Sequence, residues 1–157
     1  MSLELSTAGI TVSYACESTA GTRPTTASSY TQLTGIKSIP DMNPEPSSLQ
    51  VTDLSDTRFH RYIKGLMDMG GNLGFNLNLN QANYTTWEAM VTASETAKAT
   101  GKATWYVINV PGLTNAFYFA GDPASLGMPA AEVDSVLEAT GYIAPNQVSG
   151  WAAKPST

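Results

Sequence analysis

The amino-acid sequence predicts a mainly β domain with one α-helix, and three observations support this class. Apolar side chains alternate strictly with glycine or asparagine over Asn72–Asn80, which is the pattern of a strand with one buried face. Charged residues make up only 13% of the chain, and Thr, Ser, Ala, Gly and Asn replace them, a composition that favours β structure. Helical spacing of apolar residues is clear in one stretch, about 86–99.

The 157 residues are most simply one domain, 1–157, with enough apolar residues (42%) for a sizeable core. The net charge is −5 and the sequence has no basic cluster, so tight binding of nucleic acid through phosphate neutralisation is excluded. Such a chain could still enclose DNA without holding it. Cys16 is the single cysteine, which excludes an internal disulfide and a thiolate zinc site.

Both ends of the sequence are polar, and neither shows the pattern of a helix or strand. Residues 1–9 are predicted to form a flexible arm, and residues 152–157 a polar C-terminal tail. The first residues lack the basic and apolar regions of a signal peptide, and no apolar run approaches about 20 residues. We therefore expect a protein that is made in the cytoplasm and does not span a membrane.

The first strands are predicted on either side of a proline-rich loop. Ile10–Cys16 alternates as a strand, and Tyr30–Ile39 is a second strand with a bulge at Gly35. Three prolines within residues 40–47 predict a projecting loop, because proline cannot donate to a sheet. Leu49–Leu54 is expected to be a strand, and Arg58–Lys64 an extended segment.

The predicted helix covers Thr86–Ala99. Thr85 with Glu88 matches a capping box, which places the helix start at this point. Trp87, Met90, Val91 and Ser94 follow the spacing of one helix face and should pack on the sheet. Gly101 lies where a left-handed C-terminal cap is expected.

The rest of the chain is predicted to be strands, apart from one ambiguous segment. Trp105–Val110 is rich in aromatic and β-branched residues and should be a buried strand, with Ala116–Ala120 as the next. Residues 130–144 fit either a short helix or a strand, and the local pattern leans to helix. A turn at 145–147 should then lead into Val148–Ala152, which could pair back.

The sequence contains no constellation of catalytic or metal-ligating residues. His60 is the one histidine, and Arg58 and Arg61 beside it would repel a cation. Asp53, Asp56 and Asp68 lack the spacing of a calcium loop and are better explained as turn and capping residues. We expect no cofactor, no metal and no enzyme activity. The mixed charges around Arg58–Lys64 indicate either salt links across a subunit contact or a solvated edge.

A series of short motifs resembles the siphophage-type tail tube proteins, also called major tail proteins. In chain order they are the strand ending IPD, the Pro/Glu loop, VTDLSD, the spaced residues of YIKGLMDMG, the alternating strand and helix, VINVPG, FYFAGDPASLG and EVDSVLEATGYI. The resemblance covers about Gly9 to Trp151. These motifs are degenerate, so their order along the chain carries more weight than any single one.

The resemblance implies a fold, an assembly and a set of partners. The fold would be a β-sandwich or small barrel of about seven or eight strands with one flanking helix, and residues 130–144 would then be strand. The protein would be a structural virion protein of the tail, assembled in the host cytoplasm into stacked, usually hexameric rings. Double-stranded DNA would pass through the resulting tube without tight binding. Other partners would be the tape measure protein, the tail terminator and the baseplate or tip proteins.

The resemblance and the charge pattern together suggest two groups of site residues. The candidates for subunit or ring contacts lie on the proline loop and the mixed-charge segment: Ile39, Pro40, Asp41, Pro44, Pro46, Asp53, Asp56, Arg58, Arg61 and Tyr62. The candidates for the lumen face are the amides of the alternating strand: Asn76, Asn78 and Asn80. An uncharged lining in an acidic protein would let DNA slide.

Two alternatives to the siphophage tube remain open. One is the tube subunit of a contractile tail or type VI secretion system, which shares the fold. The other is a carbohydrate-binding or adhesin-like module, whose sugar platforms would be an exposed Trp87, Trp105 or Trp151. This second alternative requires exposed tryptophans, and it fails if Trp87 and Trp105 are buried.

Overall fold

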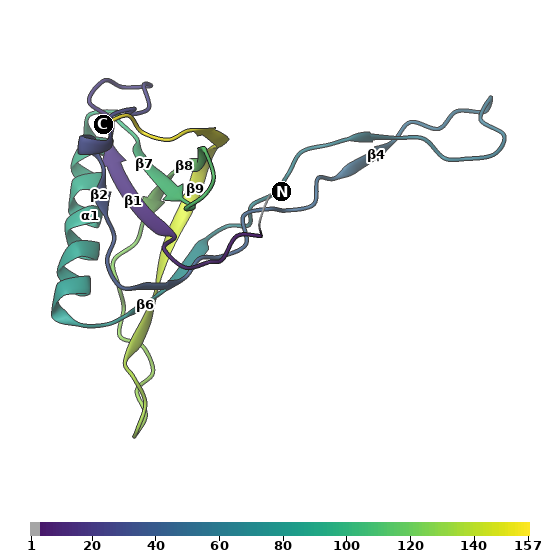
Figure 1. The fold of residues 1–157 in the computed structure, drawn as a ribbon. Helices are drawn as coiled ribbons and strands as arrows, with labels where there is room; N and C mark the ends of the chain where they lie inside the picture. The colour runs from purple at the N-terminus through teal and green to yellow at the C-terminus, as the bar shows by residue number, and fades with distance from the viewer. Residues whose placement is uncertain (1–3) are drawn as a thin grey trace.

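The computed structural model describes residues 4–157, and within this range nine strands and one α-helix form a curled sheet with a long projecting arm (Figure 1). A single 3-10 turn, η1, lies at Ala27–Ser29. The helix and strands are, in chain order, β1 (Thr11–Cys16), β2 (Thr31–Gln32), β3 (Ile36–Ser38), β4 (Ser48–Gln50), β5 (Tyr62–Lys64), β6 (Leu73–Asn78), α1 (Gln81–Ala99), β7 (Thr104–Asn109), β8 (Asn115–Pro123) and β9 (Glu138–Ala153).

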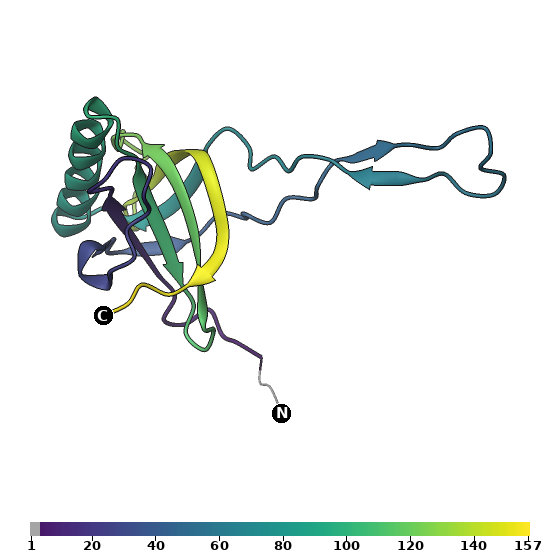
Figure 2. The ribbon, with the colours of Figure 1, turned by 90° about the horizontal axis from the view of Figure 1, so that it is seen from above.

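Seven strands of the described range form one antiparallel sheet in the order β2-β1-β7-β8-β9-β6-β3. The two edge strands, β2 and β3, belong to one extended segment. The Leu33 N–H donates to Val12 on one side, and the Asn78 N–H donates to Gly35 on the other. This segment therefore connects the two edges of the curled sheet, and α1 lies on the concave side (Figure 2). The predicted class, mainly β with one flanking helix, is confirmed.

Two apolar clusters lie on opposite faces of the sheet. The first joins the inward side chains of β6, including Phe75, to Trp87 and Met90 of α1. Tyr106 and Phe119 stack at its centre, with ring centroids 5.0 Å apart. The second lies on the outer face of the same central strands, contains Trp105, Val107, Ala116, Tyr118 and Ala120, and has Tyr30, Ala103 and Ala152 packed against it. The strict alternation of β6 is confirmed, because Leu73, Phe75 and Leu77 are all buried.

The helix begins five residues earlier than the sequence predicted. Asn80 is its N-cap and accepts a hydrogen bond from the Asn83 N–H at 2.9 Å. Asn80 is therefore not part of the alternating strand, which ends at Asn78. The predicted capping box is wrong: the Thr85 hydroxyl bonds back to Gln81 within the helix, and Glu88 accepts the Leu126 N–H. Because the asparagine cap lies just after β6, the helix begins at Gln81, about one turn before Thr85.

The C-terminal end of α1 agrees with the sequence. Gly101 has a φ of 77°. Its N–H donates to the Lys98 carbonyl and the Lys102 N–H donates to the Ala97 carbonyl, which is the Schellman arrangement. Trp87, Met90, Val91 and Ser94 are buried, as their spacing predicted. Within residues 4–157 no helix combines the length and the hydropathy that crossing a bilayer requires.

The ambiguous segment 130–144 is partly loop and partly strand. Residues 130–137 are irregular and exposed, and β9 begins at Glu138. The helix favoured by the local pattern is therefore wrong, and the strand implied by the resemblance is correct from Glu138 onward. The predicted turn at 145–147 is also wrong, since β9 continues to Ala153. Pro145 is accommodated because the β8–β9 register shifts at Ala120/Gly121, next to its partner position.

Three other expectations change in detail. The second predicted strand is split into β2 and β3, because the left-handed Gly35 (φ 77°) transfers the segment from one sheet edge to the other. Of the predicted N-terminal arm, residues 1–3 lie outside the described residues, and residues 4–9 form no strand. The C-terminal tail follows the body, since the Ser156 N–H donates to Thr25 and its carbonyl accepts from Ala27.

One buried carboxylate joins β1 to β7 and to the loop after β1. Glu17 is 5% exposed and accepts the indole N–H of Trp105 at 2.8 Å. It also accepts the N–H groups of Gly21 and Ala103. Burial by itself disfavours the charge, but these three donors outweigh it, and the pKa of Glu17 lies below its ordinary value.

Candidate assembly surfaces

The most prominent surface of the molecule is a two-stranded arm, residues 40–70, which projects from one side of the sheet (Figures 1 and 2). Its ribbon pairs β4 with β5 in the register Ser48↔Lys64, Leu49↔Ile63 and Gln50↔Tyr62. Prolines 40, 44 and 46 keep the outgoing chain extended and out of the main sheet. The predicted projecting loop 40–47 is the outgoing half of this arm, and the arm continues well beyond it.

The arm has an apolar face that solvent reaches. Leu49 and Ile63 are opposite each other and therefore share a face with Val51. Their exposed fractions are 53%, 52% and 38%. Beyond this face the arm exposes five more large apolar side chains: Leu54, Phe59, Tyr62, Leu66 and Met67. An isolated two-stranded hairpin is marginally stable in water, so a ribbon with these side chains exposed gains stability when another surface covers it.

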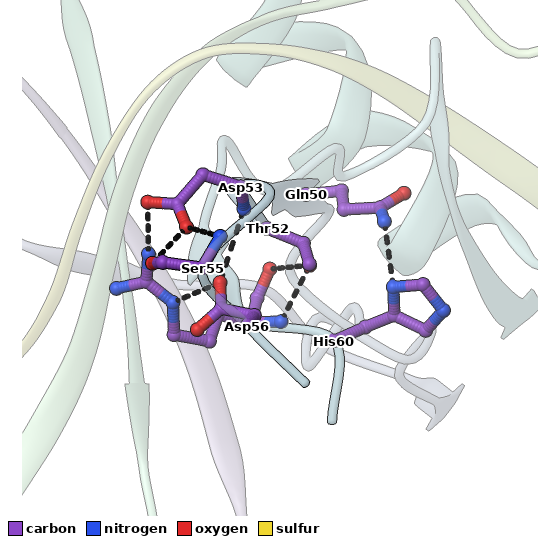
Figure 3. A network of polar contacts seen from close by, with 7 residues as sticks. Gln50, Thr52, Asp53, Ser55, Asp56 and His60 are labelled. Atoms are coloured by element: carbon purple, nitrogen blue, oxygen red, sulfur yellow. Dashed lines mark hydrogen bonds and ion pairs between the residues drawn. The ribbon is translucent and has the colours of Figure 1, made fainter. Parts of the chain in front are cut away.

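The tip of the arm is ordered by a charged network (Figure 3). The Arg61 guanidinium donates to Asp56 at 2.8 Å and to Asp53 at 3.2 Å. The Ser55 hydroxyl and N–H both donate to Asp53 and hold the pKa of that carboxyl below its ordinary value. The turn is thus fixed by polar bonds on one side, and it leaves the Leu54 side chain fully exposed.

Two further charged or titratable groups lie beside this network. The Arg58 guanidinium lies over the Phe59 ring at 5.4 Å, and it makes no ion pair within residues 4–157. His60 Nδ1 is 2.9 Å from the Gln50 amide, so the histidine lies on the polar face of the ribbon. The tip therefore combines an exposed apolar pair, Leu54 and Phe59, with an unpaired cation.

The predicted contact residues all lie on the arm or at its root. Asp53, Asp56 and Arg61 form the tip network, with Arg58 nearby. Pro40, Asp41, Pro44 and Pro46 lie on the outgoing chain, and Tyr62 is on β5. Ile39 differs from the others, because it is half-buried against the core cluster and anchors the root of the arm. Their role as contact residues stays a prediction.

An apolar pocket of about 710 Å³ lies where the arm meets the sheet. The arm contributes Pro40, Met42, Met67 and Met69, and the ends of β8 and β9 contribute Phe117 and Trp151 among others. Trp151 is 55% exposed and meets the Phe117 ring edge-on at 5.5 Å. The pocket thus has thioether and aromatic walls, a lining that adapts to different apolar groups.

The predicted lumen residues do not share one environment. Asn76 and Asn78 are on the outer face of β6 and are half-buried. The Asn76 amide donates to Glu138, which also pairs with Lys37, so this face includes charges. Asn80 is the N-cap of α1 and is turned to the helix, which separates it from the other two. The lumen role stays a prediction for Asn76 and Asn78, and Asn80 has a structural task of its own.

Within residues 4–157 no group of three or more His, Cys, Asp or Glu side chains is placed to hold a metal ion.

The carbohydrate-binding alternative depends on where the tryptophans lie. Trp87 and Trp105 are 1% and 4% exposed, so they cannot serve as sugar platforms. The carbohydrate-binding alternative therefore fails on the condition stated for it, and of its three named tryptophans Trp151 alone is at the surface, 55% exposed.

The apolar side of the arm and the whole pocket were not predicted from the sequence. Apart from Ile39 and Tyr62, the predicted contact residues are charged residues and prolines. They do not include the apolar residues Leu49, Leu54, Phe59 and Ile63. A signal was present: between Pro46 and Gly70 large apolar residues recur, although the structure has no helix there to bury them. The pocket could not be found in this way, since its walls come from five segments that are far apart in the sequence.

Comparisons with known proteins show the fold. No protein-family model matches the chain, and no curated protein matches it. A solved structure does: a chain of the cryo-EM structure of the anti-feeding prophage (AFP) baseplate, 6-fold symmetrised, is similar with a TM-score of 0.65. The two chains are 11% identical, and the similarity covers 98% of each. The similarity therefore extends over nearly the whole length of both chains.

Proposed function

We propose that this chain is a structural subunit of a phage tail or a tail-derived particle, and that it works by self-assembly. The observation that carries the proposal is the arm, 40–70, whose large apolar side chains are exposed in the isolated subunit. The fold similarity to a chain of a six-fold symmetrised baseplate indicates the kind of particle. The motif order of the sequence supports the same class independently.

In its specific form, the proposal is a tail tube subunit that forms stacked hexameric rings around a channel for DNA. The arm supplies contacts between copies, and the acidic, lysine-poor chain lets DNA pass without tight binding. Asn76 and Asn78 on the outer face of β6 are the candidate lining. The copies would meet a tape measure protein inside the tube, and terminator and tip proteins at its ends.

A second candidate is a baseplate subunit built on the same fold. It is favoured by the structural neighbour, which is part of a baseplate. A tube subunit of a contractile or type VI system is a variant of the first candidate. Continuous tubes of the purified protein would favour the tube subunit, whereas isolated rings that never stack would favour the baseplate subunit.

The test is to remove the outer arm without touching the body. At the base of the ribbon the Gly65 N–H donates to the Ser47 carbonyl, and the Ser47 N–H donates to the Leu66 carbonyl. Ser48–Lys64 can therefore be replaced by an Asn-Gly turn. Neither core cluster contains a residue of 48–64, and the body should keep its thermal midpoint within a few degrees. The shortened protein should be monomeric in analytical ultracentrifugation.

The full-length protein, concentrated and viewed by negative-stain electron microscopy, should form rings or tubes with a central channel. The matched control replaces three residues of another exposed loop, Ala130–Glu132, with Gly-Ser-Gly and should assemble normally. Full-length protein that forms neither rings nor tubes would contradict self-assembly. Tubes that persist without the outer arm would contradict its role.

A further inference from the structure

We infer that the tip of one copy's arm inserts its apolar side chains into the root pocket of a second copy of this chain. The inference deepens the proposed self-assembly and rests on it. The tip offers Leu54, which is fully exposed, and Phe59, which is 74% exposed. The pocket at the root offers thioether and aromatic walls from Met42, Met67 and Trp151.

Tip and pocket match in size and in chemistry. A volume of about 710 Å³ is in the range of pockets that enclose drug-sized groups, and one leucine and one phenylalanine side chain fit within it. Three of the walls are methionines, whose unbranched chains repack around an inserted ring. Trp151 remains 55% exposed in the isolated subunit, and an inserted side chain would cover it.

The charges around the two surfaces are complementary. The tip has the Arg58 guanidinium, which has no carboxylate partner in the described residues. At the root, Asp41 lies between the pocket residues Pro40 and Met42, and Asp68 lies between Met67 and Met69. Both carboxylates are exposed, and each accepts a backbone N–H and no cation within the described part of the chain. Insertion of the tip would bring the free cation to two free carboxylates.

The geometry makes the contact a head-to-tail one. Tip and root are at opposite ends of the same arm (Figure 1). A copy that donates its tip therefore still has an empty pocket at its own root. Such a heterologous contact either closes a ring or extends without limit. Two surfaces of one chain thus suffice for a repeating assembly, and each occupied pocket also fixes the root of the next arm.

A photo-cross-linking experiment tests the contact on the full-length protein. Phe59 is replaced by p-benzoylphenylalanine, whose excited ketone inserts into nearby C–H bonds and reacts readily with methionine. An equal mixture of 15N-labelled and unlabelled protein is irradiated, and cross-links between copies are identified by mass spectrometry. The expected partners are Met42, Met67 and Met69. The control has the probe at Met128, which is 79% exposed on a different loop and should not label the pocket.

Charge reversal provides the second measurement. Arg58→Glu places like charges against the root and should raise the concentration needed for assembly about tenfold or more. Asp41→Arg together with Asp68→Arg should restore assembly in that background. Lys64→Glu, the same charge change on the ribbon but away from the tip, is the matched control. Restored assembly cannot come from a merely destabilised fold.

The inference is overturned if the probe at position 59 labels residues 130–137 or another tip, if it labels no second copy, or if the charge swap fails to restore assembly. If one of these results is found while electron microscopy still shows rings or tubes, only the tip contact is contradicted and the proposed function is retained. A full-length protein that forms no particles and no cross-links between copies would remove both.

Discussion

The variant Trp87→Ala tests whether the Trp87 side chain is part of the core. Trp87 is 1% exposed, and its indole N–H donates to the Ala124 carbonyl at 2.9 Å. Its ring lies directly against Gly141, since a Cβ built there would be 2.3 Å from the indole Cζ2. The variant therefore opens a large cavity between α1 and β9 and leaves one carbonyl without its donor. Burial of this kind predicts a loss of about 3–5 kcal/mol in the free energy of unfolding.

Trp151→Ala is the matched control, because it removes the same side chain from an exposed site. Trp151 is 55% exposed and has one edge-on aromatic contact, with Phe117. Its loss should cost no more than about 1.5 kcal/mol, the upper range for an aromatic pair. The two variants have the same composition, so the difference between them comes from their positions.

Urea unfolding followed by far-UV circular dichroism gives both values without relying on tryptophan emission. A domain of this size has a total stability of about 5–15 kcal/mol, so Trp87→Ala should still fold but with a much lower midpoint. If Trp87→Ala is too unstable to purify, Trp87→Phe gives a measurable intermediate loss. Two results would refute the assignment of the helix face. One is a loss below about 1 kcal/mol for Trp87→Ala, and the other is a loss for Trp151→Ala that exceeds the loss for Trp87→Ala.

Three further variants test local features of the fold. Glu17→Gln leaves buried N–H donors without the carboxylate and should cost about 1–3 kcal/mol at neutral pH. Because the pKa of Glu17 is lowered by folding, its contribution is complete above pH 4.5 and is lost as the pH falls through the folded value, so wild type and variant should converge in acid urea titrations. Asn80→Ala removes the helix N-cap and should cost about 1 kcal/mol, whereas Asn80→Asp should retain most of it. Gly141→Ala forces a methyl group into the Trp87 ring and should cost at least about 1–3 kcal/mol, and less in a Trp87→Phe background. Equal costs in both backgrounds would place the clash elsewhere.

The sequence predicted the elements whose pattern depends on one buried face. Leu73, Phe75 and Leu77 alternate because the sheet buries one side of β6 and leaves amides on the other. Trp87 and Met90 keep helical spacing because α1 buries a single stripe. In both cases the environment is set by the chain itself, so the local pattern is sufficient.

Prediction failed where a distant segment determines the local conformation. β9 runs through Pro145 because β8 holds it in pairing on both sides of a register shift, and nothing near Pro145 encodes this. The helix start was misplaced because Asn80 serves two purposes, as the end of an alternating pattern and as a cap. The amphipathic ribbon of the arm was missed for a different reason: its apolar face has no partner within the chain, so it follows no burial pattern.

The size of the tip contact sets the way in which the protein should assemble. Full burial of Leu54 and Phe59 supplies about 1.5–3 kcal/mol each, or about 3–6 kcal/mol together. Association of two copies costs about 4–15 kcal/mol in lost freedom, so one tip in one pocket does not hold a stable dimer. Closing a ring adds a last contact without a further loss of translational freedom, which makes the closed particle far more stable than its fragments.

We therefore expect a sharp concentration threshold, with monomers and closed particles in sedimentation velocity and almost no dimers or trimers between them. Leu54→Ser with Phe59→Ser should move the threshold upward by more than tenfold, since both apolar side chains are lost from every contact of the ring. A smooth monomer–dimer curve in the unmodified protein would contradict this reasoning, because it would require a pairwise contact much stronger than two side chains provide.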